Sequence, residues 1–179
     1  MNKLCEGNSK PTSTHIEGVK RLLKYLIGTI DWGIVLGGLE YSKENLGLHI
    51  YADAAFGDDP IHRYSTGGHV VLAGGGLIYW KSKKQTLVTL SSTEAEFINL
   101  TPVGQSAIWL ATILKEAGCP QNVPFIFFTD SANAQHIALN PYNTARTRHI
   151  DIRYKWIQDR VQKGYFNVKH VKTLEMMAD

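Results

Sequence analysis

The sequence predicts an α/β protein with a mixed five-stranded sheet and flanking helices, and three observations lead to this prediction. From residue 46 onward, the patterns follow the order of three strands, helices, one strand, helices and a final strand. The segment Phe125 to Thr129 is almost wholly apolar, which is typical of a strand covered on both faces. Hydrophobic residues make up 44% of the 179 positions, so the chain can bury a core.

Composition excludes several other classes of protein. Cys5 and Cys119 are too few for a disulfide framework or a zinc site. The first residues lack the apolar region of a signal peptide, and no apolar run reaches the roughly 18 residues that span a bilayer. We therefore expect an intracellular, cytoplasmic protein with no membrane partner. The net charge of +3 is too small to indicate nucleic-acid binding by itself.

The N-terminal region should form a helical appendage ahead of the main domain. A helix is predicted from about Pro11 to Gly28, and a short strand from Ile34 to Leu39. The polar stretch Ser42 to Asn45 marks the boundary. One face of the helix is apolar and comprises Ile16, Val19, Leu22, Leu23, Leu26 and Ile27.

Three strand patterns open the main domain as an antiparallel meander, at residues 46–53, 68–73 and 77–81. Gly74, Gly75 and Gly76 connect the last two strands. A glycine run can also bind phosphate, but no helix follows this one, so a hairpin turn is the favoured interpretation.

A long helix should follow, with Ser91 and Glu94 as a capping box and Ser92 or Thr93 as alternative caps. Pro102 predicts a kink or a restart in this helix. At 3.6 residues per turn, Glu96 begins a core-facing stripe that continues through Leu100, Val103, Ala107, Leu110 and Leu114. A core-facing carboxylate needs a partner, although both glutamates can also simply stabilise the helix N-terminus.

Four carboxylates lie at the ends of predicted elements and form a candidate site. Asp53 ends the first core strand, Asp130 ends the buried strand before helices at 131–139 and 148–163, and Asp179 follows the last strand, 165–171. Together with Glu96 they offer the oxygen ligands that Mg²⁺ prefers. Spacing alone does not exclude three other acids from such a site, namely Asp58, Asp59 and Asp151.

Six motifs carry a resemblance to a known family over roughly residues 46 to 179. They are Tyr-Ala-Asp-Ala-Ala-Phe (51–56), Arg-Tyr-Ser-Thr-Gly-Gly (63–68), Trp-Lys-Ser-Lys-Lys-Gln (80–85), Leu-Ser-Ser-Thr-Glu-Ala-Glu-Phe (90–97), Thr-Asp-Ser-Ala-Asn-Ala (129–134) and Arg-Thr-Arg-His-Ile-Asp-Ile-Arg-Tyr (146–154). In this order they resemble the ribonuclease H domain of copia-type retrotransposon Pol polyproteins. The resemblance implies a ribonuclease H-like fold.

Residues 10–36 resemble the end of the reverse transcriptase region that lies just upstream in such polyproteins. The similarity rests on Arg-Leu-Leu-Lys-Tyr-Leu-Ile-Gly-Thr (21–29) and Asp-Trp-Gly (31–33). It implies that residues 1–45 are a reverse transcriptase tail and that 46–179 are a ribonuclease H-like domain, truncated at its last helix. The implied partner is the reverse transcriptase region of the same polyprotein, inside a virus-like particle in an intact element.

The resemblance also implies the reaction, which is endonucleolytic cleavage of the RNA strand of an RNA–DNA hybrid by two Mg²⁺ ions, with Mn²⁺ as a possible substitute. Asp53 and Asp130 would be the chief metal ligands. Glu96 would hold a metal and engage the 2′-hydroxyl side, and Asp179 would complete the second metal site. Many relatives have Asp-Ala-Asp-Trp where this chain has Asp-Ala-Ala-Phe, so only the first aspartate, Asp53, is retained.

Candidate substrate-binding residues are cations that can follow phosphates and polar groups beside Asp130. They are Lys83, Lys84, Arg146, Arg148, His149, Ser131 and Asn133. The alternatives are a solvated surface charge for each lysine, a structural role for the histidine, and helix capping by Ser131 or Asn133.

Two other functions remain as alternatives. A retrotransposon-derived remnant could keep the fold and bind nucleic acid without turnover. An integrase-type transferase would order its acids as Asp, Asp, Glu, whereas the glutamate comes second in this chain, which argues against it.

Overall fold

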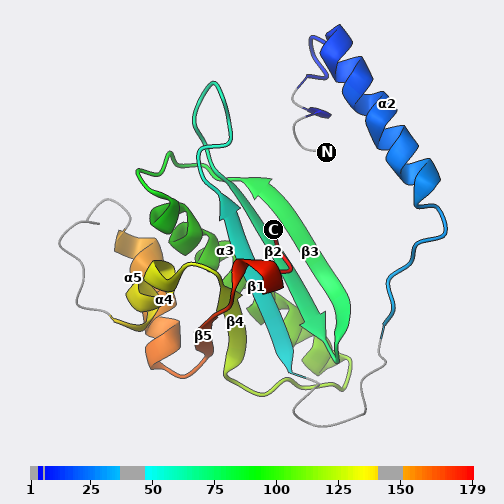
Figure 1. The fold of residues 1–179 in the computed structure, drawn as a ribbon. Coiled ribbons are helices and arrows are strands. Elements are labelled where there is room, and N and C mark those ends of the chain that lie inside the picture. Colours follow the sequence, from blue (N-terminus) through cyan, green and yellow to red (C-terminus); the bar gives the residue numbers. More distant parts are fainter. Residues whose placement is uncertain (1–3, 6, 37–46, 141–150) are drawn as a thin grey trace. The chain divides into compact units, whose positions relative to one another are not determined.

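The computed structural model describes residues 4–5, 7–36, 47–140 and 151–179, with only the backbone for residues 151–154. The chain divides into two compact units, Met1–Val35 and Leu36–Asp179, and each is described by itself (Figure 1). The predicted boundary at residues 42–45 lies outside the described residues, so the assignment of the two segments stays a prediction.

The first unit contains one long helix, α2 (Ser13–Gly28), as predicted. Its cap is reciprocal, because the backbone N–H of Thr12 donates to Nδ1 of His15 at 3.0 Å and the two side chains meet at 2.7 Å. None of the α2 side chains is buried. The strand expected from Ile34 is not formed over residues 34–36, and the rest of that prediction lies outside the described residues.

The second unit is built on a five-stranded sheet in the order β3-β2-β1-β4-β5 (Figure 1). β1 pairs antiparallel with β2 and β2 with β3, whereas β1 with β4 and β4 with β5 are parallel. This confirms the mixed α/β sheet expected from the sequence. The strands are β1 (Leu48–Ala55), β2 (Thr66–Ala73), β3 (Gly76–Lys84), β4 (Phe125–Thr129) and β5 (Phe166–His170).

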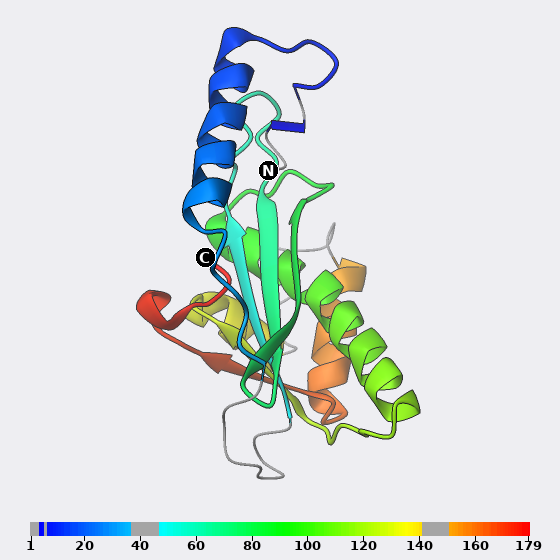
Figure 2. The same ribbon diagram turned by 90° about the vertical axis from the view of Figure 1, so that its right-hand side faces the viewer.

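Helices α3 (Ser92–Glu116) and α5 (Asp151–Gln162) pack on the same face of the sheet, as Figure 2 shows. Alternating residues of β1 point into this layer, so Leu48, Ile50 and Ala52 are fully buried. A shorter helix, α4 (Ala132–Leu139), follows β4 and is capped by Ser131. The core is therefore formed between the sheet and these helices.

The restart predicted at Pro102 is wrong, because α3 continues through this residue, whereas the alternative of a kink stays a prediction. Pro102 lies on the exposed side of the helix, while residues before and after it are buried against the sheet. This packing outweighs the one backbone hydrogen bond that proline cannot donate. By its length and hydropathy α3 could also cross a membrane. Half of its apolar 18-residue segment is buried within the described structure, however, as in the core helix of a soluble fold.

After β5 the chain forms a short 3-10 turn, Thr173–Glu175, and ends on the face of the sheet opposite α3 (Figure 2). The turn stands where the resemblance implies the start of a last helix. Met176 is buried, and a Cβ placed on Gly68 of β2 would lie 3.1 Å from the carbonyl oxygen of Ala178. The last residues therefore pass close over β2, beside the end of β1.

Candidate active site

Three carboxylates from separate elements meet at one edge of the sheet. Asp53 lies near the end of β1, Asp130 directly follows β4, and Glu96 lies in the second turn of α3. One oxygen from each carboxylate lies within 4.8 Å of the other two. β1 and β4 are parallel neighbours, so their carboxyl ends share an edge, and the N-terminus of α3 is packed against it. The cluster therefore follows from the topology.

Asp53 and Glu96 share a backbone donor. The N–H of Ala54 lies 2.8 Å from Oδ1 of Asp53 and 3.0 Å from Oε1 of Glu96. Asp53 is half-buried on the face opposite Ala52, which is the alternation expected for the strand. One amide hydrogen divided between two carboxylates cannot neutralise both, so the pair is short of positive charge.

Glu96 is buried and incompletely paired. Its side chain is 7% exposed, and Oε2 has no hydrogen-bond partner among the residues that the structure describes. Burial, reinforced by the negative charge of Asp53, raises the pKa of Glu96 to about 9. A bound divalent cation would supply the missing charge, and the set of hard oxygen ligands suits one. The three carboxylates thus fit a metal.

Asp130 is positioned by β5 and the turn after it. Its Oδ2 accepts a hydrogen bond of 2.9 Å from Oγ1 of Thr173, and Nε2 of His170 lies 3.0 Å from its carbonyl oxygen. Since a carbonyl can only accept, the His170 nitrogen donates in this contact. Sequence reasoning missed both residues. The parallel pairing of Thr129 with His170 brings His170 and the turn after it to Asp130. This pairing cannot be recognised without knowing the strand order.

Asn99 fixes the backbone under Asp53. The side chain is 3% exposed, and its Nδ2 donates to the carbonyl oxygens of Asp53 at 2.7 Å and Gly68 at 2.9 Å. A Cβ at Gly67 would collide with Oδ1 of Asn99, so only glycine leaves room for the amide. Sequence reasoning missed Asn99 too, although its place three residues after Glu96 puts it on the same side of α3.

The fourth predicted carboxylate stands apart. Asp179 is exposed and is not part of the 4.8 Å cluster among the described residues. It does line a shallow hollow of about 380 Å³ together with Asp53 and Ser82. The structure therefore brings three of the four predicted acids together and leaves Asp179 at the rim.

The competing acids have other partners. Asp58 accepts a hydrogen bond from Oγ1 of Thr66 at 2.9 Å. Asp59 accepts from the backbone of Ile61 at 3.0 Å and pairs with Nζ of Lys84 at 3.0 Å. Both therefore stabilise the loop between β1 and β2. The side chain of Asp151 lies outside the described residues.

The predicted substrate-binding residues differ in their placement. Ser131 caps α4, because its Oγ accepts from the N–H of Ala134 at 3.2 Å, as one of the sequence alternatives expected. Asn133 is exposed in the first turn of the same helix, beside Asp130. Lys83 lines a cavity described below, and Lys84 is held by Asp59. Arg146, Arg148 and His149 lie outside the described residues.

Comparison with known sequences finds relatives over the whole chain, although no family model matches it. The retrovirus-related Pol polyprotein from transposon RE1 of Arabidopsis thaliana is 37% identical over 180 residues, which cover all of this chain. The corresponding polyprotein from transposon TNT 1-94 of Nicotiana tabacum is 37% identical over 169 residues, or 94% of the chain. The chain spans only 12% of the length of each polyprotein.

A shorter relative, the secreted RxLR effector protein 161 of Plasmopara viticola, is 39% identical over 108 residues, which are 60% of this chain and 72% of that protein. Homology to part of this chain is therefore found outside the long polyproteins as well.

Solved structures share the fold at low sequence identity. The N-terminal ribonuclease H domain of a Mycobacterium tuberculosis protein matches with a TM-score of 0.56 and 15% identity, over 75% of this chain and 88% of that one. The LC11 ribonuclease H1, solved in complex with an RNA/DNA hybrid, matches with a TM-score of 0.51 and 11% identity, over 73% and 88%. At these identities the likeness shows the fold alone.

Proposed function

Because this chain is a homologue of copia-type retrotransposon Pol polyproteins over its whole length and has a ribonuclease H-like fold, we propose that it hydrolyses the RNA strand of RNA–DNA hybrids. The observation that carries the proposal is the cluster of Asp53, Glu96 and Asp130, whose oxygens lie within 4.8 Å of one another. Homology and fold support a nuclease of this class, and the choice of a hybrid as substrate is our inference.

The cluster is suited to divalent cations, and we assign Mg²⁺ to it. Asp53, Glu96 and Asp130 would hold the metal, with Asp179 as an outer ligand of a second ion. When bound, such ions activate water and stabilise the leaving oxygen of an in-line phosphoryl displacement.

The chain's own residues prepare this site. Asn99 and Thr173 fix the backbone of Asp53 and one oxygen of Asp130, so both carboxylates have a set direction before substrate arrives. Without a cation, Glu96 keeps a proton at neutral pH, and it must lose that proton to become a ligand. In this proposal Asn133, which is exposed in the first turn of α4, contacts the sugar–phosphate backbone of the RNA strand.

The first 45 residues are, in this proposal, the end of a preceding reverse transcriptase region, and the site acts during reverse transcription inside a cytoplasmic particle. Support comes from the homology, which extends over the N-terminal residues as well as the ribonuclease H-like unit. The exposed apolar residues of α2, such as Leu23 and Leu26, fit a helix that packs against such a region.

One observation favours a second function. Asp179 lies outside the carboxylate cluster, so a second metal site would have fewer ligands than the first. A domain that binds hybrids but does not cleave them is the alternative.

Cleavage of a hybrid labelled on its RNA strand, in Mg²⁺ or Mn²⁺, separates the two functions. We expect cleavage by the unaltered chain, its loss in Asp53→Asn, and no change in Glu116→Gln. Glu116 is a matched acid at the far end of α3, roughly 30 Å from Glu96 at 1.5 Å per residue. Hybrid binding without cleavage under both metals would establish the alternative, and cleavage that survives in Asp53→Asn would refute the assigned site.

A further inference from the structure

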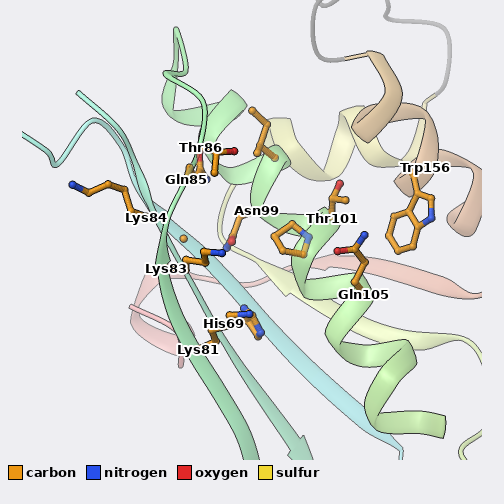
Figure 3. Close-up of a pocket in the computed structure, with 13 residues that line it drawn as sticks. His69, Lys81, Lys83, Lys84, Gln85, Thr86, Asn99, Thr101, Gln105 and Trp156 are labelled. Atoms are coloured by element: carbon orange, nitrogen blue, oxygen red, sulfur yellow. The ribbon is translucent and has the colours of Figure 1, made fainter. Parts of the chain in front are cut away.

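A cavity of about 440 Å³ lies on the helix side of the sheet, away from the carboxylate cluster. Figure 3 shows side chains from β2, β3 and α3 around it, with Trp156 of α5 on the far side of α3. Its volume is in the range of cavities that bind small ligands. The carboxylate cluster does not use this space.

The polar wall of the cavity is cationic. Lys81 and Lys83 are two residues apart on β3, so they project to the same face, and β2 places His69 and Gly67 opposite them. Lys84 also lines the cavity, but its side chain points away from α3 in Figure 3 and its Nζ is held by Asp59. Among the described residues that line the cavity, none is acidic. The two lysines therefore act without a neighbouring carboxylate in the wall.

His69 forms a buried part of this wall. The residue is 4% exposed, and its ring packs against Tyr79 with centroids 5.5 Å apart. Its Nε2 has no hydrogen-bond partner in the part of the chain that the structure describes. An unpaired buried nitrogen is destabilising, and a ligand that supplies a partner removes that cost.

We propose that this cavity is an anion site that binds a phosphate group through Lys81 and Lys83, with His69 as a third polar contact. A phosphate provides oxygens for both ammonium groups and, where it carries a proton, a donor for the histidine. Ile98, Pro102 and Trp156 supply an apolar wall that suits a sugar or base attached to the phosphate. Free phosphate and the backbone of a nucleic-acid strand share this chemistry.

The site is distinct from the carboxylate cluster, although His69 and Lys81 also line the hollow beside Asp53. Its residues face α3, whereas Asp53 faces the opposite side of β1. Loss of cleavage therefore need not affect phosphate binding, and the two proposals can fail independently.

The test is a titration of the full chain, labelled in its histidine rings, followed by NMR at pH 7 without divalent metal. Inorganic phosphate is added in one arm and a short single-stranded oligodeoxynucleotide in the other, and His69→Gln assigns the signal. We expect a saturable shift of the His69 resonance, and affinity at least about tenfold weaker in the double variant Lys81→Gln/Lys83→Gln. Lys115→Gln, which removes an exposed lysine near the end of α3, should bind like the unaltered chain.

Each outcome of the titration either supports or overturns the proposed anion site. A shift with inorganic phosphate identifies free phosphate as a sufficient ligand, and a shift with the oligonucleotide alone identifies a nucleic-acid backbone. No shift in either arm, or equal affinity in the double lysine variant shown by circular dichroism to be folded, overturns the proposal.

Discussion

The carboxylate cluster lies at the edge of the sheet where β1 and β4 end, the lysine-lined cavity lies between β2, β3 and α3, and the two have opposite charge. The first gathers Asp53, Glu96 and Asp130, and the second places Lys81 and Lys83 beside His69. Each region contains one buried titratable group, Glu96 in the first and His69 in the second. The charged form of each group would have the same sign as the charges around it. Both groups are therefore held in the neutral form at pH 7.

The pKa shifts have parallel causes. Burial, reinforced by Asp53, raises the pKa of Glu96 to about 9. Burial, reinforced by Lys81, lowers the pKa of His69 to about 4. Each buried group also has one polar atom without a partner among the described residues. Each region thus lacks a counter-charge, a cation in one and an anion in the other.

Asn99 connects the two regions. It lines the cavity (Figure 3), and its amide also donates to the carbonyl oxygen of Asp53. Two regions of opposite charge therefore share one structural residue, which lines the cavity and holds the backbone of the carboxylate cluster at Asp53.

The largest effect is expected from Asp130→Asn. Removal of one of three clustered carboxylates should lower hybrid cleavage by about a thousandfold or more, because a neutral amide replaces a negatively charged ligand of the metal. Phosphate binding in the cavity should not change. Asp159→Asn, on α5 and paired with Lys163, is the matched control. Rates measured under single turnover test this, and a loss below tenfold would remove Asp130 from the metal ligands.

The connection through Asn99 can be tested with Gly67. A methyl group there would collide with the Asn99 amide, so Gly67→Ala should lower the free energy of unfolding by about 2 kcal/mol and reduce cleavage. In an Asn99→Ala background the same methyl group has room, and its cost should fall below about 1 kcal/mol. Urea denaturation of the four proteins measures this coupling.

A matched control for that cycle is Gly28→Ala, because a Cβ at Gly28 meets nothing within 4 Å. Its cost should be the same with and without Asn99. Equal costs of Gly67→Ala in both backgrounds would show that Asn99 does not restrict position 67.

A pH-dependent effect on stability is expected from Glu96→Gln. The carboxyl has a pKa of about 9 in the folded chain against an ordinary 4.5, so between these values the folded state holds a proton that the unfolded state has lost. The free energy of unfolding therefore falls as pH rises through this window, and the penalty is absent below it. Glutamine removes the penalty, so we expect a gain of about 2 kcal/mol at pH 9 and none near pH 4.

Urea unfolding of both proteins at several pH values, without metal, measures that gain. Mg²⁺ should reduce it, because a cation stabilises the ionised Glu96. A gain that stays constant with pH would mean that the proton on Glu96 is not its cause.

The sequence could predict the parts of the site that depend on local pattern. The apolar run Phe125 to Thr129 is β4 as predicted, and the stripe from Glu96 to Leu110 is buried as the helical period requires. Asp53 and Asp130 were found because strand ends are recognisable, and parallel pairing then brings them together.

The rest depends on contacts between distant segments. Asn99 and His69 acquire their roles from the packing of α3 on β2, and Thr173 acquires its role from the path of the chain after β5. The restart predicted at Pro102 failed for the same reason, since a local propensity was outweighed by burial on both sides of the proline.

The smallest effect is expected from Thr173→Val, which removes the hydroxyl that donates to Oδ2 of Asp130 and keeps the side-chain shape. The contact is exposed, so its loss should cost stability little, at most about 1 kcal/mol. Asp130 would lose its fixed direction, and half-maximal cleavage should need about two- to fivefold more Mg²⁺. Thr112→Val, which removes a hydroxyl that donates to the backbone of Ile108, is the matched control and should leave the Mg²⁺ requirement unchanged. An unchanged requirement in Thr173→Val would mean that Asp130 is oriented by its backbone alone, through His170 and β5.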